Sequence, residues 1–135
     1  MKRIGVFTSG GDSPGMNACL RAVVRTAAWK KVAVTGIRRG YEGMIDGDFQ
    51  EMRPESVSNI IHLGGTILKT ARSKRFLTSD GRKQAFAQLK EAEIEALIAI
   101  GGDGRVAGAT VFQQEFAIPG IGIPGTLATD LAGSA

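Results

Sequence analysis

Short apolar runs alternate along the chain with stretches in which apolar residues recur every three or four positions. The short runs, bounded by glycine and polar residues, predict buried strands at residues 2–7, 32–37 and 96–100, and a last strand within residues 118–125. The helical spacing predicts helices from about residue 14, over residues 54–63, over residues 79–93 and from residue 104 to about 115. Strands that alternate with helices predict the α/β class: a three-layer α-β-α domain with a mostly parallel sheet.

The stretches between these elements are rich in glycine, which occurs 19 times in the chain. Residues 38–48, RRGYEGMIDGD, predict a loop because three glycines interrupt any helical pattern. Residues 66–73 predict a brief extended piece that leads into a basic loop. The glycines follow no repeat period, and no linker divides the chain. We therefore expect residues 1–135 to form one domain.

Cys19 is the only cysteine of the 135 residues, so no internal disulfide can form, and we expect a cytoplasmic protein. Cys19 lies in an apolar helical stretch, which favours a small buried residue over a nucleophile. No apolar run is long enough to cross a membrane, and the start of the chain, MKRIGVF, has no signal-peptide pattern. We therefore expect no membrane partner.

The net charge of +4 indicates anionic partners. Nucleic acid is not the expected partner, because only 6% of the residues are aromatic and the arginines form small dispersed clusters. Such clusters suit phosphorylated small molecules better. A merely solvated basic surface remains the alternative for Lys30, Lys31 and Lys83.

Two predicted strands end in glycine-rich turns that open helices, FTSGGDSPGMN and AIGGDGRVAGA. Helix amino termini carry unpaired N–H groups and the positive end of the helix dipole, so phosphate is favoured there. Glycine lets the backbone approach such an anion without a clashing Cβ. The P-loop and the dinucleotide fingerprint are both absent from the sequence. Asp103, between two glycines, is either a helix cap or a ligand that holds Mg²⁺ near phosphates.

The segments RIGVFTSGGDSPGMNACLRAVVR, GIRRGYEGMIDGDF, IIHLGGTILKTARS and IAIGGDG resemble the N-terminal half of ATP-dependent 6-phosphofructokinases. The resemblance covers almost the whole chain in the family's motif order and implies a Rossmann-like fold. It also implies that ATP and Mg²⁺ are bound here, with Asp103 as the metal ligand. The residues implied to contact the nucleotide are Gly11, Arg72, Ser73, Gly102, Asp103 and Gly104. Arg105 stands at the next position of this site, where the family has Ser or Thr, and its long cation could pair with a phosphate or fill nucleotide space.

Arg21 and Arg25 match the basic residues with which this family holds an ADP or phosphoenolpyruvate effector. They are four positions apart on a predicted helix, so they share a face and could clamp one phosphate group. Two solvated surface arginines are the equally weighted alternative.

The segment PGTLATD resembles the family's catalytic turn P-G-T-I-D-N-D, with Thr126 and Asp130 at the matching catalytic positions. Ala128, however, stands where the family has the aspartate that accepts the proton of the sugar hydroxyl. General base catalysis contributes about 10²–10⁴-fold. The resemblance further implies that most of the fructose 6-phosphate site lies outside these residues.

Three functional hypotheses follow. The first is a glycolytic, allosteric 6-phosphofructokinase sequence whose present chain is weakly active or inactive. The second is a stand-alone, engineered or remodelled α/β domain that binds nucleotide or phosphate without catalysis. The third is an enzyme similar to NAD kinases, which also use GGDG, although GGDSPGMN and TARS favour the phosphofructokinase resemblance. The family's tetramer makes a homo-oligomer an expected assembly.

Overall fold

A computed structural model describes residues 2–9, 15–60, 66–101 and 109–123 of the chain. The strands are β1 (Arg3–Thr8), β2 (Ala33–Ile37), β3 (Phe49–Met52), β4 (Ala96–Ile100) and β5 (Gly120–Ile123). The α-helices are α1 (Gly15–Trp29), α2 (Gly40–Asp46), α3 (Ser79–Glu91) and α4 (Ala109–Phe116). Two 3₁₀ turns, η1 (Pro54–Val57) and η2 (Arg75–Leu77), complete the described elements.

The strands form one sheet in the order β3-β2-β1-β4-β5. β1 lies in the middle and pairs in parallel with β2 and with β4, in a register that sets Thr8 opposite Ile100. β5 continues the sheet in parallel beyond β4, and β3 is antiparallel to β2. The chain thus places β2 on one side of β1 and then β4 on the other side.

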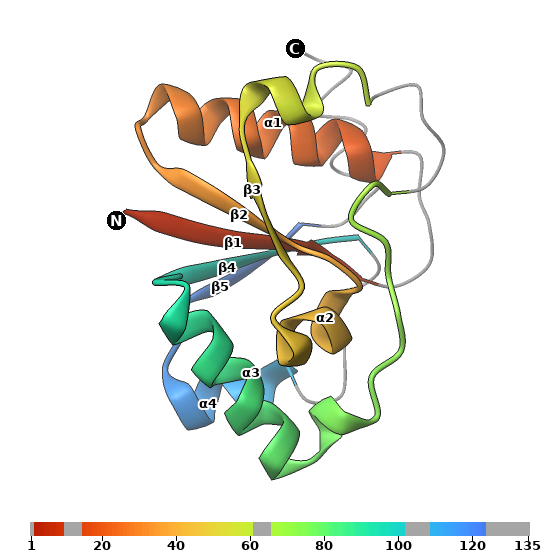
Figure 1. Cartoon of the computed structure of the whole chain (residues 1–135), viewed down its shortest axis with the longest axis vertical. Coiled ribbons are helices and arrows are strands. Elements are labelled where there is room, and N and C mark those ends of the chain that lie inside the picture. Colours follow the sequence, from red (N-terminus) through yellow and green to blue (C-terminus); the bar gives the residue numbers. More distant parts are fainter. Residues whose placement is uncertain (1, 10–14, 61–65, 102–108, 124–135) are drawn as a thin grey trace.

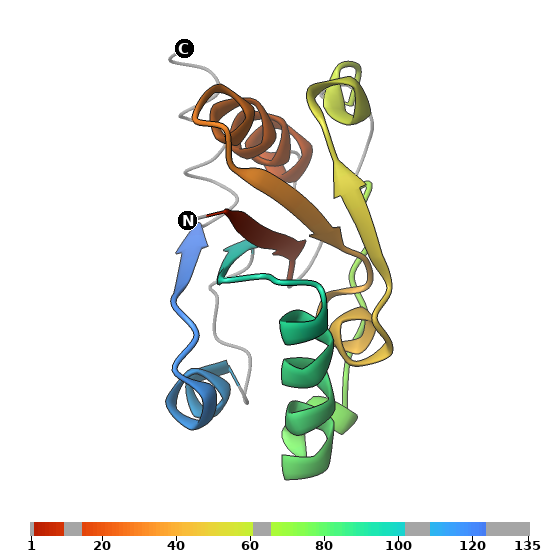
Figure 2. The same cartoon turned by 60° about the vertical axis from the view of Figure 1, so that its left-hand side comes forward.

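Helices cover both faces of the sheet, which gives the expected three-layer α/β fold (Figures 1 and 2). Because side chains alternate along a strand, Val6 points to one face and Phe7 to the other. On the first face, Val6 packs with Met16 and Leu20 of α1. On the second face, Phe7 belongs to a core with residues of α2, α3 and α4. Both cores pack against the same sheet, one on each face, so the strands that lead to the site are covered on both faces.

The loop predicted for residues 38–48 is wrong, because residues 40–46 form α2. Tyr41, Met44 and Ile45 are buried against the second face of the sheet, and their spacing of i, i+3 and i+4 is the helical signal that the glycines obscured. Gly43 is required by packing, since a Cβ on it would lie 1.5 Å from the carbonyl oxygen of Arg38.

The helix predicted over residues 54–63 is also wrong within the described part of the chain. Only the 3₁₀ turn η1 forms, and Ile60 lies outside any helix. The antiparallel strand β3 was not predicted, and the extended piece predicted at residues 66–73 contains no strand.

The other predicted strands and helices are confirmed where the structure describes them. The residue predicted to begin the first helix, residue 14, and the first residues of the fourth predicted helix, 104–108, lie outside the described residues. Cys19 is buried, as predicted, and burial raises the pKa of its thiol to about 11. Among the described helices, none combines the length and the hydropathy that a membrane span needs.

Candidate functional site

The candidate site lies where the carboxyl ends of β1 and β4 meet in the middle of the sheet. In open α/β sheets, ligands bind where neighbouring strands lead to opposite sides of the sheet, and β1 and β4 form such a switch point here. The two ends are joined by a hydrogen bond, in which the N–H of Ser9 donates to the carbonyl of Ile100 over 2.9 Å. The two glycine-rich turns of the sequence leave the sheet from these two neighbouring strands.

Gly101 shows how closely the two strand ends approach one another. Its φ of +97° is a conformation that side chains rarely tolerate. A Cβ on it would also lie 2.0 Å from Cε of Met16 and 2.9 Å from the carbonyl oxygen of Ser9. Its N–H donates to the carbonyl of Ile123 over 2.8 Å, so the residue is fixed on the β5 side as well. A glycine is therefore required at this position by the backbone and by the packing.

Most of the predicted site residues lie in segments outside the described residues. They are Gly11, Gly102, Asp103, Gly104, Arg105, Thr126, Ala128 and Asp130. In the part of the chain that the structure describes, no three His, Cys, Asp or Glu side chains are grouped as metal ligands. The assignment of Asp103 as a metal ligand thus stays a prediction.

Residues 66–69 are attached to the carboxyl end of β1. The hydroxyl of Thr8 donates to the carbonyl of Lys69 over 3.0 Å and lies 3.1 Å from the hydroxyl of Thr66. The N–H of Ile67 donates to Oδ1 of Asn17 in the first turn of α1, over 2.9 Å. These contacts bring the segment before Arg72 to the same edge of the sheet as the two turns.

Arg72 and Ser73 follow this attachment and differ in their surroundings. Arg72 is exposed, and within the described residues its side chain makes no hydrogen bond or ion pair. Ser73 is half-buried, its hydroxyl donates to Oε1 of Glu42 over 3.2 Å, and it accepts from the N–H of Phe76 over 3.3 Å. Arg72 is thus available to an anionic ligand, whereas the hydroxyl proton of Ser73 is already used.

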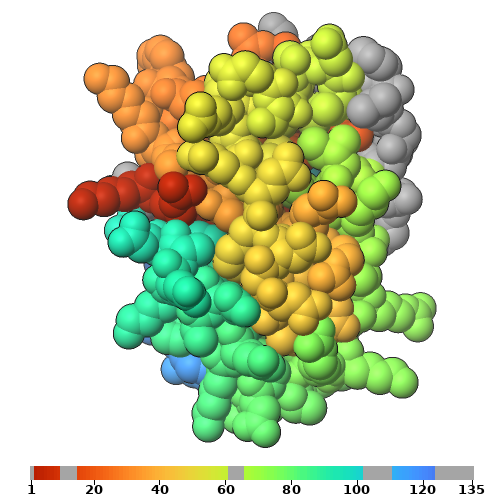
Figure 3. Space-filling view, viewed as in Figure 1, coloured from red at the N-terminus to blue at the C-terminus, as the bar shows by residue number. Residues whose placement is uncertain are grey.

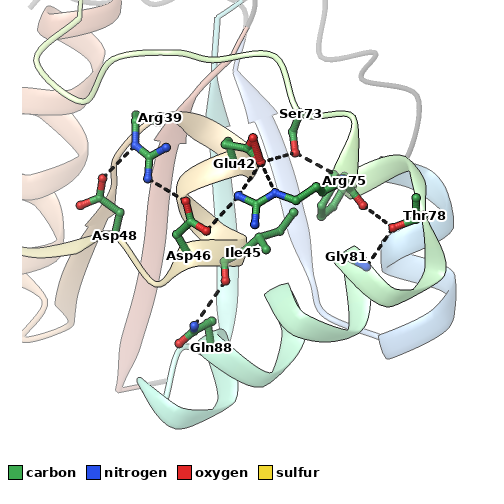
Figure 4. A network of polar contacts seen from close by, with 11 residues as sticks. Arg39, Glu42, Ile45, Asp46, Asp48, Ser73, Arg75, Thr78, Gly81 and Gln88 are labelled. Carbon is green, nitrogen blue, oxygen red and sulfur yellow. Dashed lines mark hydrogen bonds and ion pairs between the residues drawn. The ribbon is translucent and has the colours of Figure 1, made fainter.

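An ionic network on α2 lies beside this segment and was not predicted from the sequence (Figure 4). Nε of Arg75 donates to Oε1 of Glu42 over 2.8 Å, and Nη2 of Arg75 lies 2.9 Å from Oδ1 of Asp46. The other oxygen of Asp46 accepts from Arg39 over 3.0 Å, and Arg39 also contacts Asp48 over 3.1 Å. The only sequence signal is the spacing of Glu42 and Asp46, four residues apart, which places both carboxylates on one helix face.

The network shifts the pKa values of three of its members, Asp46, Arg75 and Arg39. The hydrogen bonds from Arg75 and then from Arg39 hold the pKa of Asp46 below its ordinary value. The same hydrogen bonds raise the pKa values of Arg75 and Arg39. All these groups are therefore charged at neutral pH, and two of the basic groups near the site are paired with acids.

The predicted effector arginines lie on α1, away from this network. Arg21 and Arg25 line an open cavity of about 340 Å³ together with Pro54, Glu55 and Ser58. Nε of Arg21 is buried and has no hydrogen-bond partner among the described residues. The two side chains therefore share one cavity, as their spacing predicted, although Glu55 adds a carboxylate to its lining.

The sequence matches the family model described as "Phosphofructokinase" over residues 3–135. It is 54% identical over 134 residues to ATP-dependent 6-phosphofructokinase 2 of Bacteroides thetaiotaomicron and 58% identical to ATP-dependent 6-phosphofructokinase 1 of Thermus thermophilus. Each match covers 99% of this chain but 41% and 42%, respectively, of the relative. The chain thus spans about two fifths of the length of these relatives.

Solved structures agree with the sequence matches. A phosphofructokinase from Saccharomyces cerevisiae superposes with a TM-score of 0.81 at 45% identity, covering 86% of this chain and 16% of that one. A pyrophosphate-dependent phosphofructokinase from Marinobacter aquaeolei has a TM-score of 0.70 at 19% identity, which supports the fold alone; the match covers 90% of this chain and 33% of that one. The chain belongs to the phosphofructokinase family, and it corresponds to the N-terminal half of ATP-dependent 6-phosphofructokinases.

Proposed function

We propose that this chain is the nucleotide-binding part of an ATP-dependent 6-phosphofructokinase, which transfers the γ-phosphoryl group of Mg·ATP to fructose 6-phosphate. The observation that carries the proposal is the switch point, where the glycine-rich turns leave the adjacent carboxyl ends of β1 and β4. Two described residues agree with a phosphate ligand. Position 101, where the second glycine-rich turn begins, accepts only glycine, and Arg72 is an exposed cation without a partner among the described residues.

In this proposal, backbone N–H groups of Gly11, Gly102 and Gly104 surround phosphate oxygens, as glycine-rich turns do at helix amino termini. Arg72 adds a charged side chain, and Asp103 would hold Mg²⁺. When bound, Mg²⁺ neutralises charge on the transferred phosphoryl group. Arg105 adds a second cation that pairs with a phosphate.

We propose a role for Ser73 that differs from the nucleotide contact implied by the resemblance. A hydroxyl has a single proton, and that of Ser73 donates to Glu42. Its side chain therefore cannot donate to a phosphate oxygen without breaking this bond. We infer that Ser73 acts by shaping the segment that carries Arg72.

The proposed chemistry lacks its general base, because Ala128 cannot accept a proton. A missing base costs about 10²–10⁴-fold in rate. Thr126 and Asp130 remain in the same turn, but Asp130 stands two positions further along than the missing base. We therefore expect this chain to turn over slowly or not at all, and the same substitution favours a second candidate function, a non-catalytic nucleotide-binding domain.

The remaining assignments belong to the same proposal. Arg21 and Arg25, with the cavity that they line, would bind the phosphate of an ADP or phosphoenolpyruvate effector. The unpartnered Nε of Arg21 supports this assignment, because a buried donor without a partner gains most from an anion. A cytoplasmic location and self-association remain expectations.

The test combines calorimetric titration with Mg·ATP and a coupled assay with fructose 6-phosphate. We expect Mg·ATP to bind, Arg72→Ala to weaken binding about tenfold or more, and Lys83→Ala, which removes an exposed cation of α3, to leave it unchanged. Absence of binding would refute both candidate functions. Binding without turnover, not restored by Ala128→Asp, would leave the non-catalytic domain as the function of this chain.

A further inference from the structure

We propose that Glu42 is a positioning residue for Arg72: its carboxylate holds the segment that follows Arg72 and thereby directs the guanidinium of Arg72 to the phosphates of Mg·ATP. This inference rests on the proposed function, since it concerns the same nucleotide site. It begins from the location of Arg72 in a short span between two attachment points, Lys69 and Ser73.

The first attachment is made by the sheet. The hydroxyl of Thr8 donates to the carbonyl of Lys69, and the N–H of Arg39 donates to the carbonyl of Leu68 over 2.8 Å. Gly40, at φ +57°, follows Arg39, and a Cβ on it would lie 3.4 Å from the carbonyl oxygen of Thr8. Residues 66–69 are thus fixed to the end of β1 and to the start of α2, independently of Glu42.

The second attachment depends on Glu42. Oε1 of this one residue accepts from Oγ of Ser73 and also from Nε of Arg75. The Glu42 side chain is 22% exposed, compared with 47% for Arg75, so the carboxylate is the better shielded partner. Hydrogen bonds to a charged group contribute more than neutral ones, at a partly buried site in particular. Only residues 70–72 lie between the two attachments.

Apolar packing aligns the same segment with α2. Phe76 is fully buried and stacks on Tyr41, the neighbour of Glu42, with ring centroids 4.0 Å apart. The N–H of Phe76 donates to Ser73, whose hydroxyl therefore links the ring to the carboxylate. Figure 3 shows the green segment that contains these residues lying on the surface beside the yellow of α2. Breaking the contacts of Glu42 would leave the Ser73 hydroxyl held only by the N–H of the packed Phe76.

The network also determines which of the two arginines in residues 72–75 is paired with an acid. Arg75 is paired with Glu42 and Asp46, whereas the side chain of Arg72 has no partner among the described residues. Without the carboxylates, Arg75 would compete with Arg72 for the same phosphate group, and the two guanidinium groups would repel each other. Glu42 therefore sets both the position of Arg72 and its role as the arginine offered to the ligand.

The experiment compares Glu42→Gln and Glu42→Ala with the control Glu51→Gln, which removes the charge of a β3 residue that forms an exposed 3.5 Å ion pair with Arg53. One arm measures trypsin cleavage after Arg72 without nucleotide, with the cut sites identified by mass spectrometry. We expect cleavage about five- to tenfold faster in Glu42→Ala, because cleavage follows local opening, and unchanged cleavage in the control. Ser73→Ala removes only one of the contacts of Glu42 and serves if Glu42→Ala does not fold.

The second arm measures Mg·ATP affinity by calorimetry in a double-mutant cycle of Glu42→Gln with Arg72→Ala. Glu42→Gln should weaken binding about fivefold in the presence of Arg72 and have no further effect when Arg72 is alanine. An equal loss in both backgrounds would overturn the proposal, because Glu42 would then act on the structure in general. Wild-type cleavage and wild-type affinity in both Glu42 variants would overturn it as well.

The two arms separate this proposal from the proposed function. If Arg72→Ala weakens binding and Glu42→Gln does not, the nucleotide site stands and the role of Glu42 is refuted. If the wild type binds no Mg·ATP, the proposed function and the phosphate role of Arg72 both fail, and the trypsin arm still decides whether Glu42 holds the segment.

Discussion

Gly101→Ala provides the sharpest test of the strand-end geometry. The backbone φ of +97° is strained for any residue with a Cβ, at a cost of about 1–3 kcal/mol. The new methyl group would also lie 2.9 Å from the carbonyl oxygen of Ser9, which belongs to a backbone hydrogen-bonded to Ile100. Forcing extra volume into such a site costs about 1–3 kcal/mol. The expected loss of unfolding free energy is therefore about 2–6 kcal/mol.

The assay is urea denaturation followed by circular dichroism, with Gly122→Ala as the matched control. With a typical slope of about 2 kcal/mol per molar urea, the midpoint of Gly101→Ala should fall by about 1–3 M. A Cβ on Gly122 meets nothing within 4 Å, so this variant should be unchanged or more stable by about 0.5–1 kcal/mol. Equal midpoints for Gly101→Ala and the wild type would refute the reasoning.

A cycle with Met16→Ala separates the two causes of this loss. The methyl group of Gly101→Ala would lie 2.0 Å from Cε of Met16, the flexible end of a buried side chain. Met16→Ala alone should cost about 2–5 kcal/mol by leaving a cavity. If the side-chain clash contributes, the double variant is more stable than the sum of the single losses predicts. Strict additivity would assign the whole effect of Gly101→Ala to its backbone.

Three further predictions concern titration and reactivity. Arg75 and Arg39 lower the pKa of Asp46, so the charged carboxylate contributes stability above the ordinary aspartate pKa of about 3.9, and this contribution is lost as pH falls through the lower pKa of the folded state. Asp46→Asn should remove this contribution, and equal urea midpoints for variant and wild type at pH 7 would contradict the prediction. Tyr41 is the only tyrosine, and burial raises its pKa to about 12, so absorbance at 295 nm should not titrate near pH 10 while the protein is folded. Cys19, at a pKa of about 11, should react with a thiol reagent at pH 8 far more slowly in the native than in the unfolded protein.

The elements predicted from the sequence are those whose local pattern agrees with their packing. Residues 96–100 form an apolar run between polar residues and are confirmed as β4 without change. Ser79–Glu91 was predicted from its start signal and its spacing, and it ends two residues earlier than expected. In both cases the information lies within a few residues of the chain, where periodicity can show it.

α2 and β3 were missed because distant contacts form them. Arg39 precedes α2 at φ 60°, and no side chain caps the helix, so Glu42 in the first turn is the one start signal that its sequence offers. Gly43 suggests a loop in the sequence but is needed in the structure for the close approach to Arg38. β3 has adjacent exposed residues in place of an alternating pattern, and it is a strand because β2 offers it an antiparallel partner.

The candidate site divides in the same way. Glycine-rich turns and isolated arginines can be recognised in a sequence, because the backbone freedom of glycine and the charge of arginine are properties of the residue itself. Which arginine is free cannot be found there, since Glu42 and Arg75 are 33 positions apart and meet only when α2 packs beside η2. The composition of the basic segment around Arg72 therefore does not show which of its arginines is paired with an acid. In the fold, Arg75 is paired with Glu42 and Asp46, whereas the side chain of Arg72 has no partner among the described residues, and this difference supports the phosphate role proposed for Arg72.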